Sequence, residues 1–329
     1  MRRLHVPEAW RQSAVTILEE RPHVILVLGG GDVGKSSYCC FLITELLAAG
    51  HRVAVVDANV GQKDVGPPAT VTLGYAAGTA EQWNVAPQEF YFVGSTSPVG
   101  RMLPLVVGTA RLVSTVDAPF VIVDTTGYVE GAGRVLKSYK IEAVRPDLIV
   151  AIEKRGDLES ILRSHRTYRT IRIRPSRKAR VREWWERDEA RVKAFATYFR
   201  EARRLELKLD QLTFQRSLLF TGEPFLLEGA IYAERTAEGV VAVAESALPA
   251  LIDIAKRLKP GFERNLLCGV ADEHNCGAGL AIVEGIDFDQ RTVLLMSPVP
   301  PEKVRVLQVG DLYVGLDGRE LGQVGREGI

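Results

Sequence analysis

The chain has 329 residues, among them 42 lysines and arginines and 41 aspartates and glutamates, and this length can hold one large domain and one smaller domain. The net charge of +1 excludes a basic surface spread over the whole protein, so any surface for a polyanion must be local. No apolar run approaches the roughly 18 residues of a membrane span, and the first residues lack the apolar core of a signal peptide. We therefore expect a cytoplasmic protein without a membrane partner.

Residues 1–22 predict a short amphipathic helix that leads into a buried strand beginning at Val24. After the strand comes G-x-x-x-x-G-K-[ST], the pattern of a phosphate-binding loop, and then a helix expected to end at Gly50. Glycines let backbone N–H groups close around phosphate oxygens, and the start of the helix adds a partial positive charge. The sequence thus predicts a nucleoside triphosphate site made of Gly29, Gly30, Gly31, Asp32, Val33, Gly34, Lys35, Ser36 and Ser37.

Two further strands end in an aspartate. The second strand ends at Asp57 and continues into D-x-x-x-G-Q, whose glutamine is Gln62. A later strand ends at Asp124, where P-loop enzymes keep the acid of their second motif. Within the loop, Lys35 is expected to reach the β- and γ-phosphates, and the Ser36 hydroxyl is expected to bind Mg²⁺.

Strands and helices alternate along this part of the chain. We expect an irregular loop over 66–74, a short strand over 89–94, helices over about 101–116 and 131–143, and a strand over 146–153. The strands are nearly all apolar, as strands buried on both faces of a sheet are. This alternation predicts an α/β fold with a doubly wound parallel sheet, in which ligands bind at the carboxyl ends of the strands.

A strongly basic segment follows, because residues 163–182 contain no aspartate or glutamate. Residues 184–204 then predict a helix. Arg187 and Arg191 share one face of it, together with Arg180 if the helix extends back that far. A solvated charged helix is the ordinary interpretation of such a run. Beside a phosphate loop, a basic mobile segment is also where a lid is built.

Three segments organise the whole chain: an N-terminal helical segment (1–22), a P-loop domain (23–261) with its arginine-rich lid at about 174–206, and a C-terminal all-β domain (262–329). Before residue 262 we also expect a hairpin that turns at Glu238 and Gly239, and a helix over 247–261. The C-terminal domain is expected to be antiparallel and barrel-like. Its Cys268, His274 and Cys276 do not have a standard zinc-site spacing.

The phosphate loop alone leaves several classes of protein open. Asp124 to Gly127 also satisfies the D-x-x-G of GTPases, but residues 153–156 do not match the N-K-x-D that reads guanine. A partitioning-type ATPase would carry a second lysine early in the loop, and residues 28–33 contain none. Kinases of small molecules stay open, while the arginine-rich lid favours a long polyanionic acceptor.

The chain resembles the polynucleotide 5′-hydroxyl kinase family in a combination of motifs, namely GGGDVGKSS, DANVGQKDVGPP, FVGSTSP, DTTGY and an R-x-x-x-R lid. These are RNA kinases related to the kinase subunit of the eukaryotic pre-mRNA cleavage complex, and the resemblance is greatest to the compact archaeal members. It covers nearly the whole chain. The aspartate inside the phosphate loop and the D-x-x-x-G-Q element are its most specific parts.

The resemblance implies roles for single residues. The catalytic residues that it implies are Lys35, Asp57, which would activate the 5′-hydroxyl, and the lid arginines Arg187 and Arg191. The implied metal ligands are Ser36, Asp57 and Asp124, and the implied acceptor-binding residues are Gln62, Thr125, Gly127 and Tyr128. The family has tryptophan where this chain has Tyr128, which can stack on a base or pack as a core aromatic.

The expected reaction transfers the γ-phosphoryl group of ATP to the 5′-OH end of RNA, with DNA left open as an acceptor and with Mg²⁺ or another divalent cation as cofactor. In such a reaction the protein mainly positions the reactants and neutralises charge. Two other interpretations stay open: a regulatory P-loop GTPase or ATPase, and a nucleotide-locked scaffold of an RNA-processing complex. The sequence assigns no protein partner.

Overall fold

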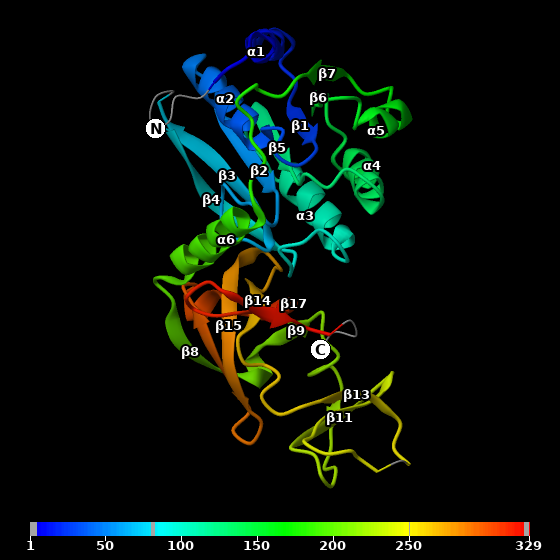
Figure 1. Cartoon of the computed structure of the whole chain (residues 1–329). Helices are drawn as coiled ribbons and strands as arrows, with labels where there is room; N and C mark the ends of the chain where they lie inside the picture. The colour runs from blue at the N-terminus through cyan, green and yellow to red at the C-terminus, as the bar shows by residue number, and fades with distance from the viewer. Residues whose placement is uncertain (1–4, 80–82, 250, 326–328) are drawn as a thin grey trace. The chain divides into compact units, whose positions relative to one another are not determined.

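The computed structural model describes residues 5–79, 83–249, 251–325 and 329, and its chain divides into two compact units (Figure 1). The first unit is Met1–Arg191 and the second is Val192–Ile329. This limit falls within helix α6 (Trp184–Phe199). The limit between domains that we expect from the sequence lies at 261/262 instead, and the strand pairing of the second unit accounts for the difference.

A parallel sheet forms the centre of the first unit, in the order β2 (Val53–Ala58), β5 (Phe120–Thr125), β1 (Val24–Gly29), β6 (Leu148–Ile152) and β7 (Thr170–Ile173). Every residue of β1, β2, β5 and β6 is buried, which explains their nearly continuous apolar sequences. The predicted doubly wound parallel sheet is confirmed. It also contains β7, which the sequence did not indicate because these residues lie in the arginine-rich segment.

Helices cover both faces of this sheet (Figure 1). They are α1 (Glu8–Glu20), α2 (Lys35–Ala48), α3 (Met102–Ser114), α4 (Ala132–Val144) and the short α5 (Glu159–Ser164). α1 and α2 pack in one core with Ile25 and Val27 of β1, whereas α3 and α4 pack in another with Leu26 and Leu28. Successive side chains of a strand point to opposite faces, so β1 contributes to both cores.

An antiparallel hairpin extends the sheet beyond β2. Its strands are β3 (Thr70–Gly78) and β4 (Trp83–Phe92), and β3 pairs with β2. The expected irregular loop over 66–74 is therefore wrong from Thr70 onwards. The two prolines before that residue suggested a loop, but Val71 and Leu73 are buried in the core beside β2, and this packing outweighs the local turn signals.

The lid helix begins where its sequence predicts but ends earlier. α6 starts at Trp184 and ends at Phe199, whereas the expected helix ran to residue 204. Arg180 lies before the helix and therefore does not share a helical face with Arg187. Among the residues that the structure describes, no helix is long and apolar enough to cross a membrane.

The second unit holds a mainly antiparallel sheet in the order β18 (Glu320–Gln323), β17 (Val306–Val314), β14 (Leu266–Ala271), β15 (Gly277–Asp287), β16 (Thr292–Ser297) and β8 (Arg203–Lys208), with β9 (Thr213–Gln215) parallel to β17. β8 and β9 precede residue 262 but pair with strands after it. This pairing moves the unit limit towards the N-terminus. Within the described ranges, no pairing joins β8 to β18 or β9 to close a barrel.

A smaller sheet in the second unit contains β10 (Glu223–Pro224), β11 (Tyr232–Thr236), β12 (Gly239–Val243) and β13 (Ile254–Leu258). The predicted hairpin at Glu238 and Gly239 is confirmed, and Gly239 has a φ of 121° that favours glycine. The predicted helix over 247–261 is wrong. Its later residues form β13, which pairs with the buried β12, so tertiary pairing overrides the helical spacing. Residue 250 lies outside the described residues.

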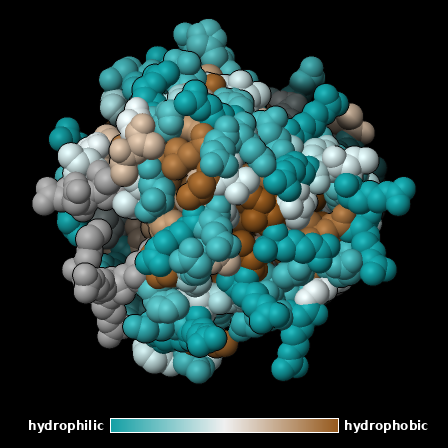
Figure 2. Space-filling model, turned by 90° about the horizontal axis from the view of Figure 1, so that it is seen from above, coloured by the Kyte–Doolittle hydropathy of each residue, from teal (hydrophilic) through white to brown (hydrophobic). Residues whose placement is uncertain are grey.

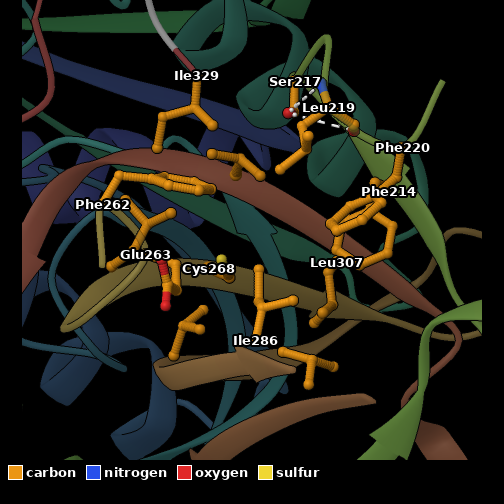
Figure 3. Close-up of a pocket in the computed structure, with 14 residues that line it drawn as sticks. Phe214, Ser217, Leu219, Phe220, Phe262, Glu263, Cys268, Ile286, Leu307 and Ile329 are labelled. Carbon is orange, nitrogen blue, oxygen red and sulfur yellow. Dashed lines mark hydrogen bonds between the residues drawn. The ribbon is translucent and has the colours of Figure 1, made fainter. Parts of the chain in front are cut away.

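A small cavity lies in the core of the second unit, with a volume of about 30 Å³ (Figure 3). Phenylalanines and aliphatic side chains form its walls, together with the carboxyl group of Glu263. Cys268 also lines the cavity, whereas His274 and Cys276 are exposed. No group of three or more histidine, cysteine, aspartate or glutamate side chains within the described part of the chain could hold a metal ion.

Candidate functional site

The phosphate loop joins β1 to α2 in a conformation that requires its glycines. A Cβ atom on Gly29 would lie 2.7 Å from the carbonyl oxygen of Ile152 on the neighbouring strand, and Gly34 has a φ of 91° at the N-terminal end of α2. Val33 is buried beneath the loop, and Ser37 lies in the first turn of α2. The loop therefore has the strand–loop–helix geometry that binds phosphate groups.

Lys35 is buried at the start of α2, and its Nζ donates a hydrogen bond of 2.7 Å to the carbonyl oxygen of Gly30. Burial lowers the pKa of Lys35, while the nearby charge of Asp124 opposes that change. The side chain thus lies folded against the loop that it is expected to serve. Turning Nζ away from Gly30 exchanges one hydrogen bond for contacts with phosphate oxygens.

Asp124 and Ser36 fit a divalent cation. The Ser36 hydroxyl donates a hydrogen bond of 2.6 Å to Oδ2 of Asp124, and Oδ1 of the same buried carboxyl has no hydrogen-bond partner in the structure. Burial, and then the charge of Asp57, raises the pKa of Asp124 to about 6. A cation at Oδ1 would satisfy this orphaned oxygen, and a hydroxyl with one carboxylate is the donor set that Mg²⁺ uses beside nucleotide phosphates.

Asp57 is also an implied metal ligand, but its carboxyl group is held differently from that of Asp124. Its Oδ1 accepts hydrogen bonds from the backbone N–H of Asn59 (3.0 Å) and lies 3.2 Å from Nζ of Lys63. Its Oδ2 accepts from the backbone N–H groups of Asp64 (2.9 Å) and Val65 (3.0 Å). These contacts fill the roughly four acceptor positions of a carboxylate. Asp57 therefore organises the loop over 57–65, and it must release a partner before it can bind a metal or take a proton.

Asp64 is a site residue that sequence reasoning missed. It lines a cavity of about 380 Å³ together with Ser36, Asp57 and Asp124. Although the residue is exposed, desolvation by the protein around its carboxyl group, and then the charge of Asp57, raises the pKa of Asp64. It lies within the DANVGQKDVGPP motif, two residues after Gln62, but the D-x-x-x-G-Q pattern does not include it.

The DTTGY segment after β5 is packed tightly against the phosphate loop. The Thr125 hydroxyl is buried and donates a hydrogen bond of 2.8 Å to the carbonyl oxygen of Val27. A Cβ atom on Gly127 would lie 2.7 Å from Cα of Gly31. Tyr128 is half-buried and packs against the core with α3 and α4. Thr125 and Gly127 therefore position this segment, and only Tyr128 keeps part of its side chain accessible to an acceptor.

Helix α4 carries two buried lysines, and one of them contacts the DTTGY segment. Nζ of Lys137 donates a hydrogen bond of 2.6 Å to the carbonyl oxygen of Thr126 and one of 3.2 Å to its hydroxyl. Lys140 is fully buried, and its Nζ has no hydrogen-bond partner in the structure. Burial lowers the pKa of Lys137 well below its usual range and that of Lys140 to about 7.

The sequence did carry a signal for these lysines. They occupy the helical stripe of α4 that is otherwise small or apolar, whose buried members are Gly133, Leu136, Lys137, Lys140, Ile141 and Val144. A lysine on a buried stripe is rarely tolerated unless it is paired or functional. Apolar spacing alone would identify this helix as an ordinary core helix, so the charges within the stripe are the signal of a functional role.

The lid meets both the phosphate loop and the D-x-x-x-G-Q element within the first unit. The guanidinium of Arg187 pairs with the carboxylate of Asp32 in the loop. Nε2 of Gln62 donates a hydrogen bond of 3.2 Å to the carbonyl oxygen of Arg187, and its Oε1 accepts one of 3.2 Å from Arg182. Arg191 instead pairs with Asp188 on its own helix at 2.9 Å. Of the two implied catalytic arginines, Arg187 is thus the one that contacts the phosphate loop.

The chain also resembles known proteins in sequence. Residues 29–201 match the model of the family described as mRNA cleavage and polyadenylation factor CLP1 P-loop. The chain is 34% identical to a polyribonucleotide 5′-hydroxyl-kinase of Pyrococcus furiosus, over 98% of this chain and 97% of that protein. A protein of the same name from Methanocaldococcus jannaschii is 32% identical over 94% of this chain and 92% of its own length.

A solved structure supports the fold. The chain aligns with the wild-type Clp1p–Pcf11p complex at a TM-score of 0.60 and 12% identity, over 92% of this chain and 79% of that chain. At such low identity, this likeness speaks for the architecture only. The matched family model covers the phosphate loop, the D-x-x-x-G-Q element, the DTTGY segment and the start of the second unit. The chain therefore belongs to the CLP1 P-loop family.

Proposed function

We propose that this protein is an ATP-dependent polyribonucleotide 5′-hydroxyl kinase, which transfers the γ-phosphoryl group of ATP to the 5′-OH end of RNA. Relatives of this name match the chain over nearly its full length. The observation that carries the proposal is the convergence of three segments. The pair between Arg187 and Asp32 brings the lid to the phosphate loop, and Gln62 joins the same lid to the loop that carries Asp57.

The proposed cofactor is Mg²⁺, held by the Ser36 hydroxyl and Oδ1 of Asp124. When bound, it would neutralise charge on the phosphate oxygens of ATP. Lys35 would leave the carbonyl oxygen of Gly30 to contact the β- and γ-phosphates. Arg187 would leave Asp32 and contact the phosphoryl group with its guanidinium. During transfer this group spreads negative charge over its oxygens, which the guanidinium would stabilise.

The proposed general base is Asp57. To accept the proton of the 5′-hydroxyl, it must exchange one of its partners for the acceptor, and Lys63 at 3.2 Å makes the longest of these contacts. Asp64 lines the same cavity and has fewer fixed partners in the structure, which makes it the second candidate. Tyr128 would contact the terminal nucleotide of the acceptor. These roles are proposals that single substitutions can separate.

A second candidate function is that of a nucleotide-locked scaffold in an RNA-processing complex, because the solved structure that aligns with the chain is a complex of two proteins. One experiment separates this function, a GTPase or ATPase and the proposed kinase. The protein is incubated with γ-labelled ATP or GTP, Mg²⁺, and RNA or DNA oligonucleotides that carry either a 5′-OH or a 5′-phosphate.

The kinase predicts label on 5′-OH oligonucleotides and none on those already phosphorylated. A nucleotide hydrolase would release labelled phosphate at the same rate with or without oligonucleotide. A scaffold would retain bound nucleotide and turn over neither substrate. Either of the last two outcomes contradicts the proposed function.

A further inference from the structure

A basic hollow lies on the first unit, outside the residues assigned to phosphoryl transfer. Its volume is about 570 Å³, and its walls include Arg163, Arg166, Arg169 and Arg172. These arginines recur at every third residue from the end of α5, through the connecting turn, into β7. They form the first half of the acid-free segment that the sequence singles out, and the lid uses only the second half.

Three of these arginines are held in place by glutamates. Arg163 and Arg172 each donate a hydrogen bond of 2.6 Å to Glu159, and Arg169 pairs with Glu20 at 2.8 Å. A guanidinium has five N–H donors, so each pair leaves donors for a further ligand. The pairs therefore orient the arginines without using all of their hydrogen-bonding capacity.

Arg166 differs from its neighbours. It is exposed, and it has no ion pair or hydrogen bond with any side chain that the structure describes. The hollow thus contains one full positive charge without a partner, beside three arginines whose positions are already fixed. Arginine is the side chain best suited to bidentate contact with phosphate oxygens.

The hollow is connected to the transfer site in two ways. Arg172 also donates a hydrogen bond of 3.1 Å to Glu153, which begins the loop that ends at Asp157. An Oδ2 of Asp157 lies 3.1 Å from the position of a Cβ atom on Gly30 in the phosphate loop. The segment after β7 runs down the unit to the start of α6 (Figure 1), and its Arg182 contacts Gln62 at 3.2 Å.

We propose that this hollow binds the phosphodiester backbone of the RNA acceptor, downstream of the 5′ end that the transfer site holds; this inference rests on the proposed function. The surface seen from the side of α1 and β7 is mainly hydrophilic, with hydrophobic side chains only in small patches (Figure 2). Such a surface suits a polyanion better than an apolar protein partner. Tyr168 packs against the core and is therefore not available to stack on a base. The proposed contact is with the RNA backbone and does not depend on the base sequence.

The proposal predicts a dependence on acceptor length. The ten residues from Arg172 to Arg182 span at most about 35 Å when extended. A 20-nucleotide RNA is longer than this distance, since one strand advances about 3.4 Å per nucleotide even when stacked in a duplex. A dinucleotide can fill the transfer site, but it has no further downstream backbone to place in the hollow.

The test compares Arg166→Ala with Arg52→Ala, which removes another exposed arginine, directly before β2. The affinity for a labelled 20-nucleotide RNA is measured by filter binding from low to high salt, and steady-state kinetics are measured with that RNA and with a 5′-OH dinucleotide. One lost phosphate contact changes the salt slope by about 0.7, which corresponds to about fivefold weaker binding at 0.1 M salt. We expect this change, and a similar rise in KM for the long RNA, in Arg166→Ala only.

Unchanged kcat, and an unchanged KM for the dinucleotide, would complete the expected pattern. Equal losses in both variants would indicate a general charge effect and overturn the proposal, as would unchanged binding of the long RNA by Arg166→Ala. If the wild-type protein phosphorylates neither acceptor, the proposed function fails. The binding measurement still tests the hollow in that case, because it does not depend on turnover.

Discussion

Two of the cavities among the described residues have opposite character. The one beside the phosphate loop has a volume of about 380 Å³ and is lined by Ser36 and the carboxylates of Asp57, Asp64 and Asp124. The one inside the second unit has a volume of about 30 Å³, with apolar walls and a single carboxyl group from Glu263. The second has room for about one water molecule. Of these two, only the first has the size and the carboxylates to hold the divalent cation proposed to accompany ATP.

The difference shows where this fold tolerates buried charge. Around the first cavity, Lys35, Lys137 and Lys140 are buried together with Asp57 and Asp124. Burying a charged group is costly unless it is paired, yet Nζ of Lys140 and one oxygen of Asp124 have no hydrogen-bond partner among the residues that the structure describes. Perturbed ionisable groups that gather in a cleft mark functional sites more often than ordinary cores. The second cavity is better explained as imperfect packing of a sheet core.

The largest effect on kcat is expected from the lid arginine that pairs with the phosphate loop. Arg187→Ala should lower kcat towards the roughly 10³-fold scale of an arginine that stabilises phosphoryl transfer, with a much smaller change in KM for ATP. Arg191→Ala is the matched variant, because its arginine pairs with Asp188 on the same helix. Steady-state kinetics check both. A steeper fall of kcat in Arg191→Ala would transfer the catalytic role to Arg191.

The next effect concerns the proposed base. Asp57→Asn should lower kcat at least about a hundredfold, the usual scale for a general base, while Mg²⁺-ATP binding measured by calorimetry persists. Asp64→Asn alters the same cavity and should lower kcat less. A greater loss in Asp64→Asn would identify Asp64 as the base. If Asp57→Asn loses ATP binding in step with turnover, Asp57 serves the loop or the metal instead.

A smaller effect is expected on stability. The pKa of Lys140 is lowered from 10.5 to about 7 by burial, so between these values the unfolded chain binds a proton that the folded chain does not. Stability of the wild type should therefore rise with pH from about 7 to about 10. Lys140→Met should raise Tm at pH 7 by about 1.5 °C or more, the shift for roughly 1 kcal/mol in a chain of this length at about 2.1 cal/mol/K per residue.

Thermal unfolding at pH 7 and pH 10 checks the Lys140 prediction, with the exposed Lys154→Met as control. The gain in Tm should shrink at pH 10, because the unfolded lysine is then close to its own pKa of 10.5 and little free energy is needed to neutralise it on folding. A gain that stays the same at both pH values would mean that packing, and not the buried charge, is responsible.

The smallest effect is expected at the cavity of the second unit. Oε2 of Glu263 is buried there without a hydrogen-bond partner. Glu263→Met removes that polar group, and we expect unchanged kinase rates with a Tm equal to or slightly above that of the wild type. A loss of turnover in a folded Glu263→Met variant would mean that the second cavity contributes to function, and the contrast between the two cavities would no longer hold.

Much of the fold could be predicted from local patterns. The apolar run before Gly29, the glycines and the helical spacing after Lys35 agree with one another, so the phosphate loop is identified from sequence alone. Asp124 was equally accessible to prediction, because it stands at the end of a buried strand. The confirmed parts are those where strand, loop and helix signals all point to one structure.

The errors arose where long-range pairing decides the structure. Residues 70–74 and 254–258 become strands only because β2 and β12 lie beside them, and no local signal reports those neighbours. The site could not be completed from motifs either. Lys137 belongs to no motif that we used, and Asp64 lies within DANVGQKDVGPP without a role assigned to it. The full set of hydrogen bonds to Asp57 depends on how the loop over 57–65 folds back on itself.

The central claim is that the phosphate loop transfers a phosphoryl group to the 5′ end of RNA. The most direct measurement is the transfer of label from γ-labelled ATP to a 5′-OH RNA by the wild-type protein and by Lys35→Ala, with circular dichroism to show that both are folded. We predict labelled RNA with the wild type and a rate lower by more than about 10³-fold in the variant. Equal labelling by a folded Lys35→Ala, or no labelling by the wild type with any nucleotide and divalent cation, would contradict this account.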